Sequence, residues 1–429
     1  MKKREIVEVT LDTIVGGGQT LGTLADGRKL FTWGGLPGEH VRVELMKKKS
    51  SFAEGIVCEV LKASSQRVEP RDGESYLSTS PWQIMQFEAE QRYKAKLIEE
   101  AFALSKVSLP VPVELYSDGR EFHYRNKVEF SWYGDTISGV DTLHLAFFRR
   151  GSKGKIIVDD SALLPSEMVQ LARIIRDTLQ TGGVSARQLK TLLIRCDANK
   201  NCVWQLYVKD TPCDFADLLM QADLPAQGGE IIYSNPKSPA SVITERLAHT
   251  GDTVLTDTIL GIPFRYATEG FFQVNIPVYE QTLQDMSAWV NTQTVDLYAG
   301  VGSIGLTIGG PNVTLVEINE HAVREMKRNI QELGIDATPV LAASEQALDY
   351  ITSDKTIIVD PPRAGLHANV VAKILESMPP RVIYLSCNPV TQARDIALLE
   401  HAYDFHFYKG YNFFPRTPHI EGLAILDKK

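Results

Sequence analysis

The 429-residue chain is poor in cysteine, and the spacing of its cysteines excludes several kinds of site. It has five, at positions 58, 196, 202, 213 and 387, with no Cys-x2-Cys pair among them. An odd number at this spacing argues against a disulfide framework and against a zinc or iron–sulfur centre, so no metal site is predicted. Long apolar runs are also missing, since none approaches the roughly 18 residues that a membrane span needs. The first residues lack the apolar core of a secretory signal. We therefore expect a cytoplasmic protein with no membrane partner.

An excess of positive charge is lacking too. The net charge of −8 is not typical of a non-specific nucleic-acid binder. The charge is uneven, however: residues 1–71 carry 12 Lys and Arg against 9 Asp and Glu, whereas residues 251–429 carry 13 against 21. A mildly basic small module is therefore joined to an acidic large one, and local basic patches remain available to RNA.

The apolar pattern divides the chain into three parts. Residues 1–62 alternate apolar and polar positions between Gly-rich turns, which predicts a small OB-like β-barrel. Residues 75–250 begin with a long amphipathic helix and continue as a mixed α+β domain with two hairpins. Residues 251–429 alternate apolar strands with helices, which predicts a Rossmann-like, doubly wound α/β domain whose ligands bind beyond the carboxyl ends of the strands.

A glycine-rich string at residues 296–305, DLYAGVGSIG, follows a predicted strand and opens a helix. Such a string brings the backbone close to a ligand, but alone it fits a dinucleotide site as well. The acidic residue before the glycines and the strand end at Val316-Glu317 favour S-adenosylmethionine, because a carboxylate there accepts ribose hydroxyls. NAD-binding folds use the same device. The predicted cofactor residues are Tyr298, Gly300, Gly302, Ser303 and Glu317.

Three reactive side chains lie at or near predicted strand ends in the same domain. They are Cys387 in VIYLSCNP, Glu421 in FFPRTPHIEG and Asp360 in TIIVDPPRAG. A lone cysteine is more often a buried core thiol, but Asn388-Pro389 end the strand directly after this one. We expect it at the sheet edge, where a following helix N-terminus favours the thiolate. A thiol, a carboxylate and a loop aspartate suit covalent chemistry on a flat heterocycle.

At these residues the chain resembles the RNA uracil-C5-methyltransferase family, which makes 5-methyluridine in tRNA and ribosomal RNA. The resemblance rests on EGFFQVN (269–275), VDLYAGVGSIGL (295–306), VEINEHAVREMKRN (316–329), IIVDPPRAGL (357–366), YLSCNPVTQARDI (384–396) and FFPRTPHIEGLAIL (413–426). Residues 1–60 resemble the family's TRAM barrel, an RNA-binding module, and YRNKVEF resembles part of its central domain. The resemblance implies a class I methyltransferase fold with S-adenosylmethionine as methyl donor.

The resemblance also assigns chemical roles. Uracil C5 is a poor nucleophile, and a thiolate added at C6 converts the ring to an enolate whose C5 can accept a methyl group. A base must then remove the C5 proton. By resemblance Cys387 is the nucleophile and Glu421 is the base. Asp360 and Gln273 are assigned to the cofactor and the uracil edge, although Gln273 could instead cap a helix.

Arg125 and Lys127 in YRNKVEF are predicted RNA contacts, with a plain surface hairpin as the alternative. The target base must be extruded or lie in a loop, since a paired base inside a stem is out of reach.

The chain departs from the family in one respect. Many relatives bind an iron–sulfur cluster through four cysteines, but this chain has none between positions 59 and 195. Ser75, Ser78 or Ser80 stands near the expected places of the first three, and Ser161 near the fourth. Serine is not a competent ligand set for such a cluster. We therefore predict no iron–sulfur cluster and expect packing alone to hold the helix after residue 81.

The predicted function is thus transfer of a methyl group from S-adenosylmethionine to C5 of a uridine in RNA by a monomeric enzyme. Because a TRAM-like module is more frequent in members that act on ribosomal RNA, we favour 23S ribosomal RNA over the tRNA T-loop. Two alternatives stay open. One is another RNA methyltransferase, acting at cytosine C5, and the other is an RNA-binding factor without catalysis.

Overall fold

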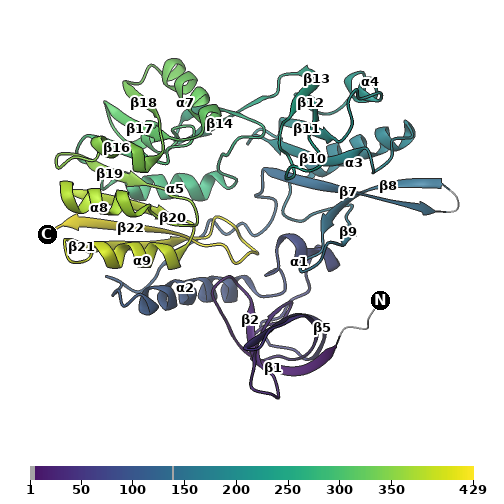
Figure 1. Cartoon of the computed structure of the whole chain (residues 1–429), viewed down its shortest axis with the longest axis horizontal. Coiled ribbons are helices and arrows are strands. Elements are labelled where there is room, and N and C mark those ends of the chain that lie inside the picture. Colours follow the sequence, from purple (N-terminus) through teal and green to yellow (C-terminus); the bar gives the residue numbers. More distant parts are fainter. Residues whose placement is uncertain (1–4, 138–139) are drawn as a thin grey trace.

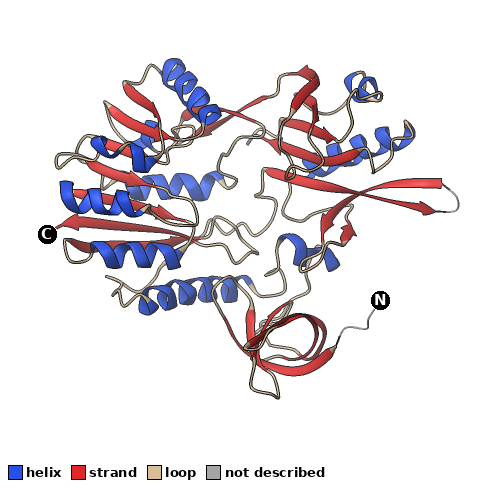
Figure 2. Cartoon of the chain, viewed as in Figure 1, coloured by secondary structure: helices blue, strands red, loops and turns tan. Residues whose placement is uncertain are grey.

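The computed structural model describes residues 5–137 and 140–429, and they form a small barrel and two large sheets (Figures 1 and 2). The barrel closes in the strand order β1-β2-β3-β5-β4. Its interior is filled by alternate apolar residues such as Val9, Leu30 and Val41, as the period of two predicts. The strands are β1 (Ile6–Ile14), β2 (Thr20–Thr23), β3 (Lys29–Trp33), β4 (His40–Lys48) and β5 (Phe52–Lys62).

A short segment, η1 (Gly73–Ser75) and α1 (Tyr76–Thr79), leads to the long helix α2 (Phe87–Leu104). The seven-stranded sheet follows, in the order β13-β12-β11-β10-β7-β8-β9, and includes both predicted hairpins, β7–β8 and β10–β11. Its strands and helices are β7 (Lys127–Ile137), β8 (Val140–Phe148), β9 (Lys155–Ile157), α3 (Ser166–Thr181), β10 (Leu189–Cys196), β11 (Cys202–Val208), α4 (Ala216–Met220), β12 (Gly228–Tyr233) and β13 (Glu245–Gly251).

The eight-stranded sheet has the order β18-β17-β16-β19-β20-β22-β21-β6. Strands β16 to β20 run parallel, and β22 is antiparallel to β20. A hairpin, β14 (Val254–Ile259) with β15 (Ile262–Ala267), precedes it. The remaining elements are β6 (Leu115–Tyr116), α5 (Ile276–Ser287), β16 (Thr294–Leu297), α6 (Gly305–Ile308), β17 (Val313–Glu317), α7 (Glu320–Leu333), β18 (Ala337–Leu341), η2 (Ser344–Gln346), η3 (Leu348–Tyr350), β19 (Thr356–Val359), α8 (Ala368–Ser377), β20 (Arg381–Ser386), α9 (Pro389–Leu399), β21 (Tyr403–Tyr411) and β22 (Glu421–Lys428).

Helices cover both faces of this sheet. Successive strand residues such as Ile357 and Ile358 belong to opposite apolar clusters, one packed on α2, α8 and α9 and the other on α5, α6 and α7. Two buried faces explain why these strands read as continuous apolar runs. The predicted doubly wound α/β fold with an N-terminal barrel is confirmed. Among the described residues, each helix is too short or too polar to cross a lipid bilayer.

Helix α2 and strand β6 come from the segment predicted as a central domain. Helix α2 nevertheless packs against α9, which covers the eight-stranded sheet, and β6 pairs with β21 of that sheet. Buried polar groups also hold it. Lys94 donates to Asn412 Oδ1 at 2.6 Å and to the Phe414 carbonyl at 3.1 Å, and it pairs with Glu90 at 3.0 Å. Glu90 in turn accepts the Arg416 N–H at 3.0 Å. The expectation that packing alone holds this helix is therefore wrong.

Candidate active site

Cys387 and Glu421 face each other at one edge of the eight-stranded sheet. Strand β20 pairs with β22 in a register that sets Ser386 opposite Gly422. Cys387 is the next residue after Ser386, and Glu421 is the residue before Gly422, so the antiparallel register makes them neighbours. Both side chains are partly exposed. The structure thus brings together two residues that lie 34 positions apart in the sequence.

Asp360 joins this edge from the neighbouring parallel strand. It follows β19 directly, and its N–H lies 3.5 Å from the Leu297 carbonyl at the end of β16. Since the carboxyl ends of parallel strands meet at one edge, Asp360 lies on the same side as Cys387.

The two carboxyl groups repel each other and bind protons tightly. Burial raises the pKa of Glu421 well above its usual range, and the neighbouring Asp360 raises it further. Burial also raises the pKa of Asp360 to about 7. Both carboxyls therefore bind protons more tightly than free carboxyl groups do.

The thiol of Cys387 differs from the sequence-based expectation. Burial raises its pKa to about 12, and the carboxylates of Glu421 and Asp360 add to this shift. The helix that begins at Pro389 was expected to favour the thiolate, but desolvation and two adjacent acids outweigh it. Cys387 therefore holds its proton until a reaction partner or a base removes it.

Arg363 is a neighbour that the sequence analysis missed. Its positive charge opposes the rise in the pKa of both Cys387 and Glu421. Asn388 fixes the Arg363 backbone by donating from Nδ2 to its carbonyl at 2.9 Å, and it caps α9 by accepting the Val390 N–H at 3.1 Å. The loop after β19 and the loop after β20 are thus tied together. Arg363 and Asn388 both lie within the motifs quoted above, and this position was the signal that could have identified them as site residues.

A buried glutamine of α9 connects β20 and β22 at this edge of the sheet. Gln392 of α9 donates from Nε2 to the carbonyls of Tyr384 and Gly422, each at 2.9 Å. It thereby joins β20 to β22 next to Cys387 and Glu421. Position 422 must be glycine, because a Cβ there would lie 2.2 Å from the Tyr408 hydroxyl oxygen.

The predicted cofactor loop lies at the end of β16, on the same edge. Its backbone adopts positive φ at Gly300 (59°) and Gly302 (87°) and also at Tyr298 (66°). A bulky residue in this region is strained, and such strain is found mainly at ligand sites. A Cβ at Gly300 would meet nothing within 4 Å in the described part of the chain, so the loop is open there.

The polar side chains around the loop have partners. Glu317 accepts the Gly300 N–H at 2.9 Å and the Asn319 N–H at 2.7 Å, and the Ser303 hydroxyl lies 2.8 Å from that of Tyr279. An open glycine loop bordered by a carboxylate fits a ligand with ribose hydroxyls and a cationic group.

Asp296, inside β16, gives a prediction on stability. It is fully buried; Oδ2 accepts the Gly305 N–H at 2.9 Å, and Oδ1 has no partner among the described residues. Burial raises the pKa of this carboxyl from 3.8 to about 8. Its contribution to stability is therefore complete below pH 3.8 and is lost as the pH rises to about 8, because the unfolded chain ionises first.

We expect Asp296→Asn to flatten this dependence by roughly 1 kcal/mol per pH unit between pH 5 and 7. Urea unfolding across this range measures the free energy of unfolding. Asp404→Asn, at an exposed position of β21, is the control and should keep the wild-type slope. An equal slope in Asp296→Asn and wild type would contradict the argument.

The other predicted contacts lie at the start of β7 and in the loop before α5. Lys127 donates from Nζ to the Glu269 carbonyl at 3.0 Å, and Arg125 donates from Nε to the Lys127 carbonyl at 3.0 Å. Gln273 lies in the loop before α5 and is not its cap, which is Asn275. The predicted RNA contacts of Arg125 and Lys127 stay predictions, and Lys127 already has a structural partner.

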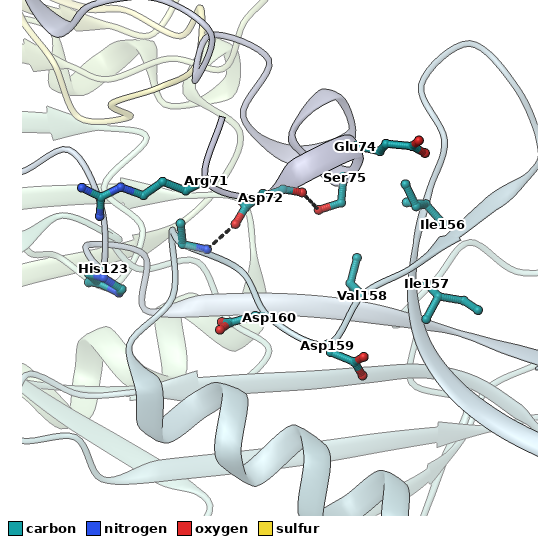
Figure 3. A pocket seen from close by; sticks show the side chains of 11 residues that line it. Arg71, Asp72, Glu74, Ser75, His123, Ile156, Ile157, Val158, Asp159 and Asp160 are labelled. Atoms are coloured by element: carbon teal, nitrogen blue, oxygen red, sulfur yellow. Dashed lines mark hydrogen bonds between the residues drawn. The ribbon is translucent and has the colours of Figure 1, made fainter. Parts of the chain in front are cut away.

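A cavity of about 550 Å³ lies away from these strand ends, between residues 71–75 and the segment from Ile156 to Ala162 (Figure 3). Ser75 lines it, and its hydroxyl donates to the Asp72 carbonyl at 2.8 Å. The Asp72 carboxylate accepts the Ala162 N–H at 2.6 Å and Gln83 Nε2 at 2.8 Å. Asp72 thus connects the two segments where the family's cluster ligands were expected.

The absence of an iron–sulfur cluster remains a prediction. In residues 5–137 and 140–429, no three His, Cys, Asp or Glu side chains gather as a metal ion requires. We expect purified protein to be colourless and to contain less than about 0.1 iron per chain, since serine does not replace the thiolates. Iron and sulfide assays measure this, and stoichiometric amounts of both would refute it.

Comparisons with known proteins agree with this geometry. The family described as "tRNA (Uracil-5-)-methyltransferase" matches residues 348–429, and "Conserved hypothetical protein 95" matches residues 279–387. An uncharacterized RNA methyltransferase of Enterococcus faecalis is 29% identical over 100% of this chain and 98% of its own length. One from Fusobacterium nucleatum is 25% identical over 100% and 97%.

The fold has a solved counterpart. The structure of Pyrococcus abyssi tRNA (uracil-54, C5)-methyltransferase in complex with S-adenosyl-L-homocysteine aligns with a TM-score of 0.78 at 20% identity, covering 98% of this chain and 100% of that one. The family match covers Asp360, Cys387 and Glu421, and both RNA methyltransferase relatives match the chain along its whole length. The chain therefore resembles RNA uracil-C5-methyltransferases, and the comparisons support an S-adenosylmethionine-dependent RNA methyltransferase.

Proposed function

We propose that this RNA methyltransferase acts on C5 of a uridine through a covalent bond between Cys387 and uracil C6. The observation that carries the proposal is the register of β20 and β22, which sets the thiol opposite the Glu421 carboxyl with Asp360 beside them. A nucleophile and a base at the same edge of the sheet serve two steps on one uracil ring. The nucleophile adds at C6, and the base removes the proton from C5.

The side chains act in sequence. In the reacting form both carboxyls are ionised, and the Asp360 carboxylate takes the proton of the Cys387 thiol as Sγ approaches C6. Sγ then bonds to C6, and the C5–C6 π electrons move to form the enolate. When bound, S-adenosylmethionine supplies an electrophilic methyl group for C5. The Glu421 carboxylate takes the C5 proton, the C5–C6 double bond re-forms, and the Sγ–C6 bond breaks with return of the electron pair to sulfur.

The raised pKa of Glu421 serves the last step, because a carboxylate that binds protons tightly is a stronger base. Tyr298, Gly300, Gly302, Ser303 and Glu317 are proposed to hold S-adenosylmethionine, with Asp360 and Gln273 between it and the uracil edge. The open loop at Gly300 and the strained Tyr298 support this assignment.

The proposed substrate is 23S ribosomal RNA, bound by a monomer in the cytoplasm, with the five-stranded barrel as an RNA-binding module. A tRNA uridine is the second candidate, favoured by the family described as "tRNA (Uracil-5-)-methyltransferase" and by the tRNA-modifying structural neighbour.

Mapping of 5-methyluridine in ribosomal RNA and tRNA from cells with and without this protein tests both. Loss of 5-methyluridine from 23S ribosomal RNA supports the favoured substrate, and loss from tRNA supports the second. Loss of 5-methylcytidine instead would indicate the cytosine-C5 reaction. Unchanged methylation of all RNA would indicate an RNA-binding factor without catalysis.

A further inference from the structure

Loop 268–273, between β15 and α5, is held by side chains of the seven-stranded sheet through its backbone carbonyls. This loop carries Gln273 and is not part of that sheet. The bonds run from Arg195 Nη1 to the carbonyls of Thr268 (3.4 Å) and Gly270 (2.6 Å), from Arg195 Nη2 to Phe272 (2.9 Å), from Lys127 Nζ to Glu269 (3.0 Å) and from Asn126 Nδ2 to Gln273 (3.2 Å). Five of six consecutive carbonyls are thus occupied by three donor side chains.

Side-chain contacts fix the same orientation. The Glu269 carboxylate accepts hydrogen bonds from Gln205 at 2.9 Å and from Arg246 at 2.5 Å. Phe272 stacks on Tyr266 with 4.1 Å between ring centroids and is buried. Phe271, its neighbour, is 75% exposed. The loop therefore turns one side to the seven-stranded sheet and presents the other outward.

This arrangement is unfavourable for a sheet built only for stability. Arg195 of β10 lies directly opposite Lys127 of β7, and like charges at such a pair destabilise a sheet. Arg195 is fully buried, and burial, followed by the charge of Arg195, lowers the pKa of Lys127 to about 8. An apolar pair at these two positions would avoid the free-energy cost of burying and opposing two like charges. Such unfavourable pairs are expected mainly where function requires them.

We propose that Arg195, Lys127 and Asn126 are positioning residues that fix loop 268–273, so that Gln273 meets the target uridine in one orientation. The inference rests on the proposed function for the role of Gln273. It assigns to the seven-stranded sheet a part in catalysis: three polar side chains at this sheet set the geometry of Gln273, which lies outside it.

The test measures the rate of covalent complex formation with RNA containing 5-fluorouridine at saturating S-adenosylmethionine. Lys127→Met and Arg195→Met keep the length of each stem and remove the donors. We expect them to slow this rate about 10-fold and about 100-fold, as loss of alignment does. Lys190→Met is the matched control, because Lys190 also lies in β10 and donates to the Asn235 and Ser238 carbonyls, away from the loop. It should change the rate less than about twofold.

A double-mutant cycle separates positioning from general support. In a Gln273→Ala background, Lys127→Met and Arg195→Met should each slow the rate by less than about threefold, because residues that act through one another are not additive. The same factors in both backgrounds would overturn the proposal. If Arg195→Met does not fold, Lys127→Met alone decides between these outcomes.

Failure of the proposed function would look different. The wild type would then form no covalent complex. Deuterium uptake by residues 268–273 would instead test whether the three donor side chains hold the loop. Uptake that rises in Lys127→Met but not in Lys190→Met supports it, and equal uptake in all three proteins overturns it.

Discussion

Replacing Cys387 with alanine is expected to abolish methyl transfer, lowering the rate by on the order of 10⁴-fold or more. The reason is that no other thiol of the described chain lies at this edge: Cys196 and Cys202 are buried in the seven-stranded sheet, Cys213 lies between β11 and α4, and Cys58 lies on the barrel. Incorporation of labelled methyl groups into RNA measures the loss. A second readout is the complex with 5-fluorouridine RNA on denaturing gels, which persists because fluorine does not leave C5 as a proton does.

Two variants make this test specific. Cys58→Ala removes an exposed thiol from β5 and should leave both readouts unchanged. Cys387→Ser keeps the size and the hydrogen bonding of the side chain but lowers its nucleophilicity, so it should resemble Cys387→Ala. A gel-stable complex formed by Cys387→Ala would show that a different residue attacks C6.

Glu421→Gln is expected to separate the first chemical step from the last. The amide is isosteric with the carboxyl but takes up no proton, so the methylated uracil should stay bonded to Cys387. Ordinary uridine RNA should then give a gel-stable complex, with turnover lowered about 10³-fold or more. Quantifying complex and released product over time measures both effects.

The same substitution acts on the thiol. Glu421 raises the pKa of Cys387, second only to burial, so its removal should lower that pKa. Complex formation by Glu421→Gln should therefore reach half of its maximal rate at a lower pH than in the wild type. Glu400→Gln, at the exposed end of α9, is the control for a lost negative charge. Product release by Glu421→Gln at the wild-type rate would refute its role as base.

The C-terminal half of the fold was predictable because its signals are local. Strands β19 and β20 are short apolar runs, and Asp360 and Cys387 follow them directly. Their meeting at one edge follows from parallel pairing. The neighbours that tune the site, Arg363 and Gln392, lay inside recognised motifs but carry no periodic signal of their own.

Contacts between distant parts of the chain were not predictable. The lysine at position 94 reads as a polar position of an amphipathic helix, yet it is buried against Asn412, 318 residues away. Arg195 reads as the polar end of a hairpin strand and instead binds three carbonyls of another segment. Such pairings depend on tertiary structure, which a single sequence does not encode as spacing.

The buried pair of Glu90 and Lys94 has a consequence for synthesis. Helix α2 emerges from the ribosome long before Asn412 and Arg416 exist, a delay of roughly 15 to 60 s at 5–20 residues per second. For that time the apolar side of the helix lacks its final neighbours, and its charged pair stays hydrated rather than dry. The edge holding Glu421 can thus become rigid only after residues 412–421 have left the ribosome, long after α2 has done so.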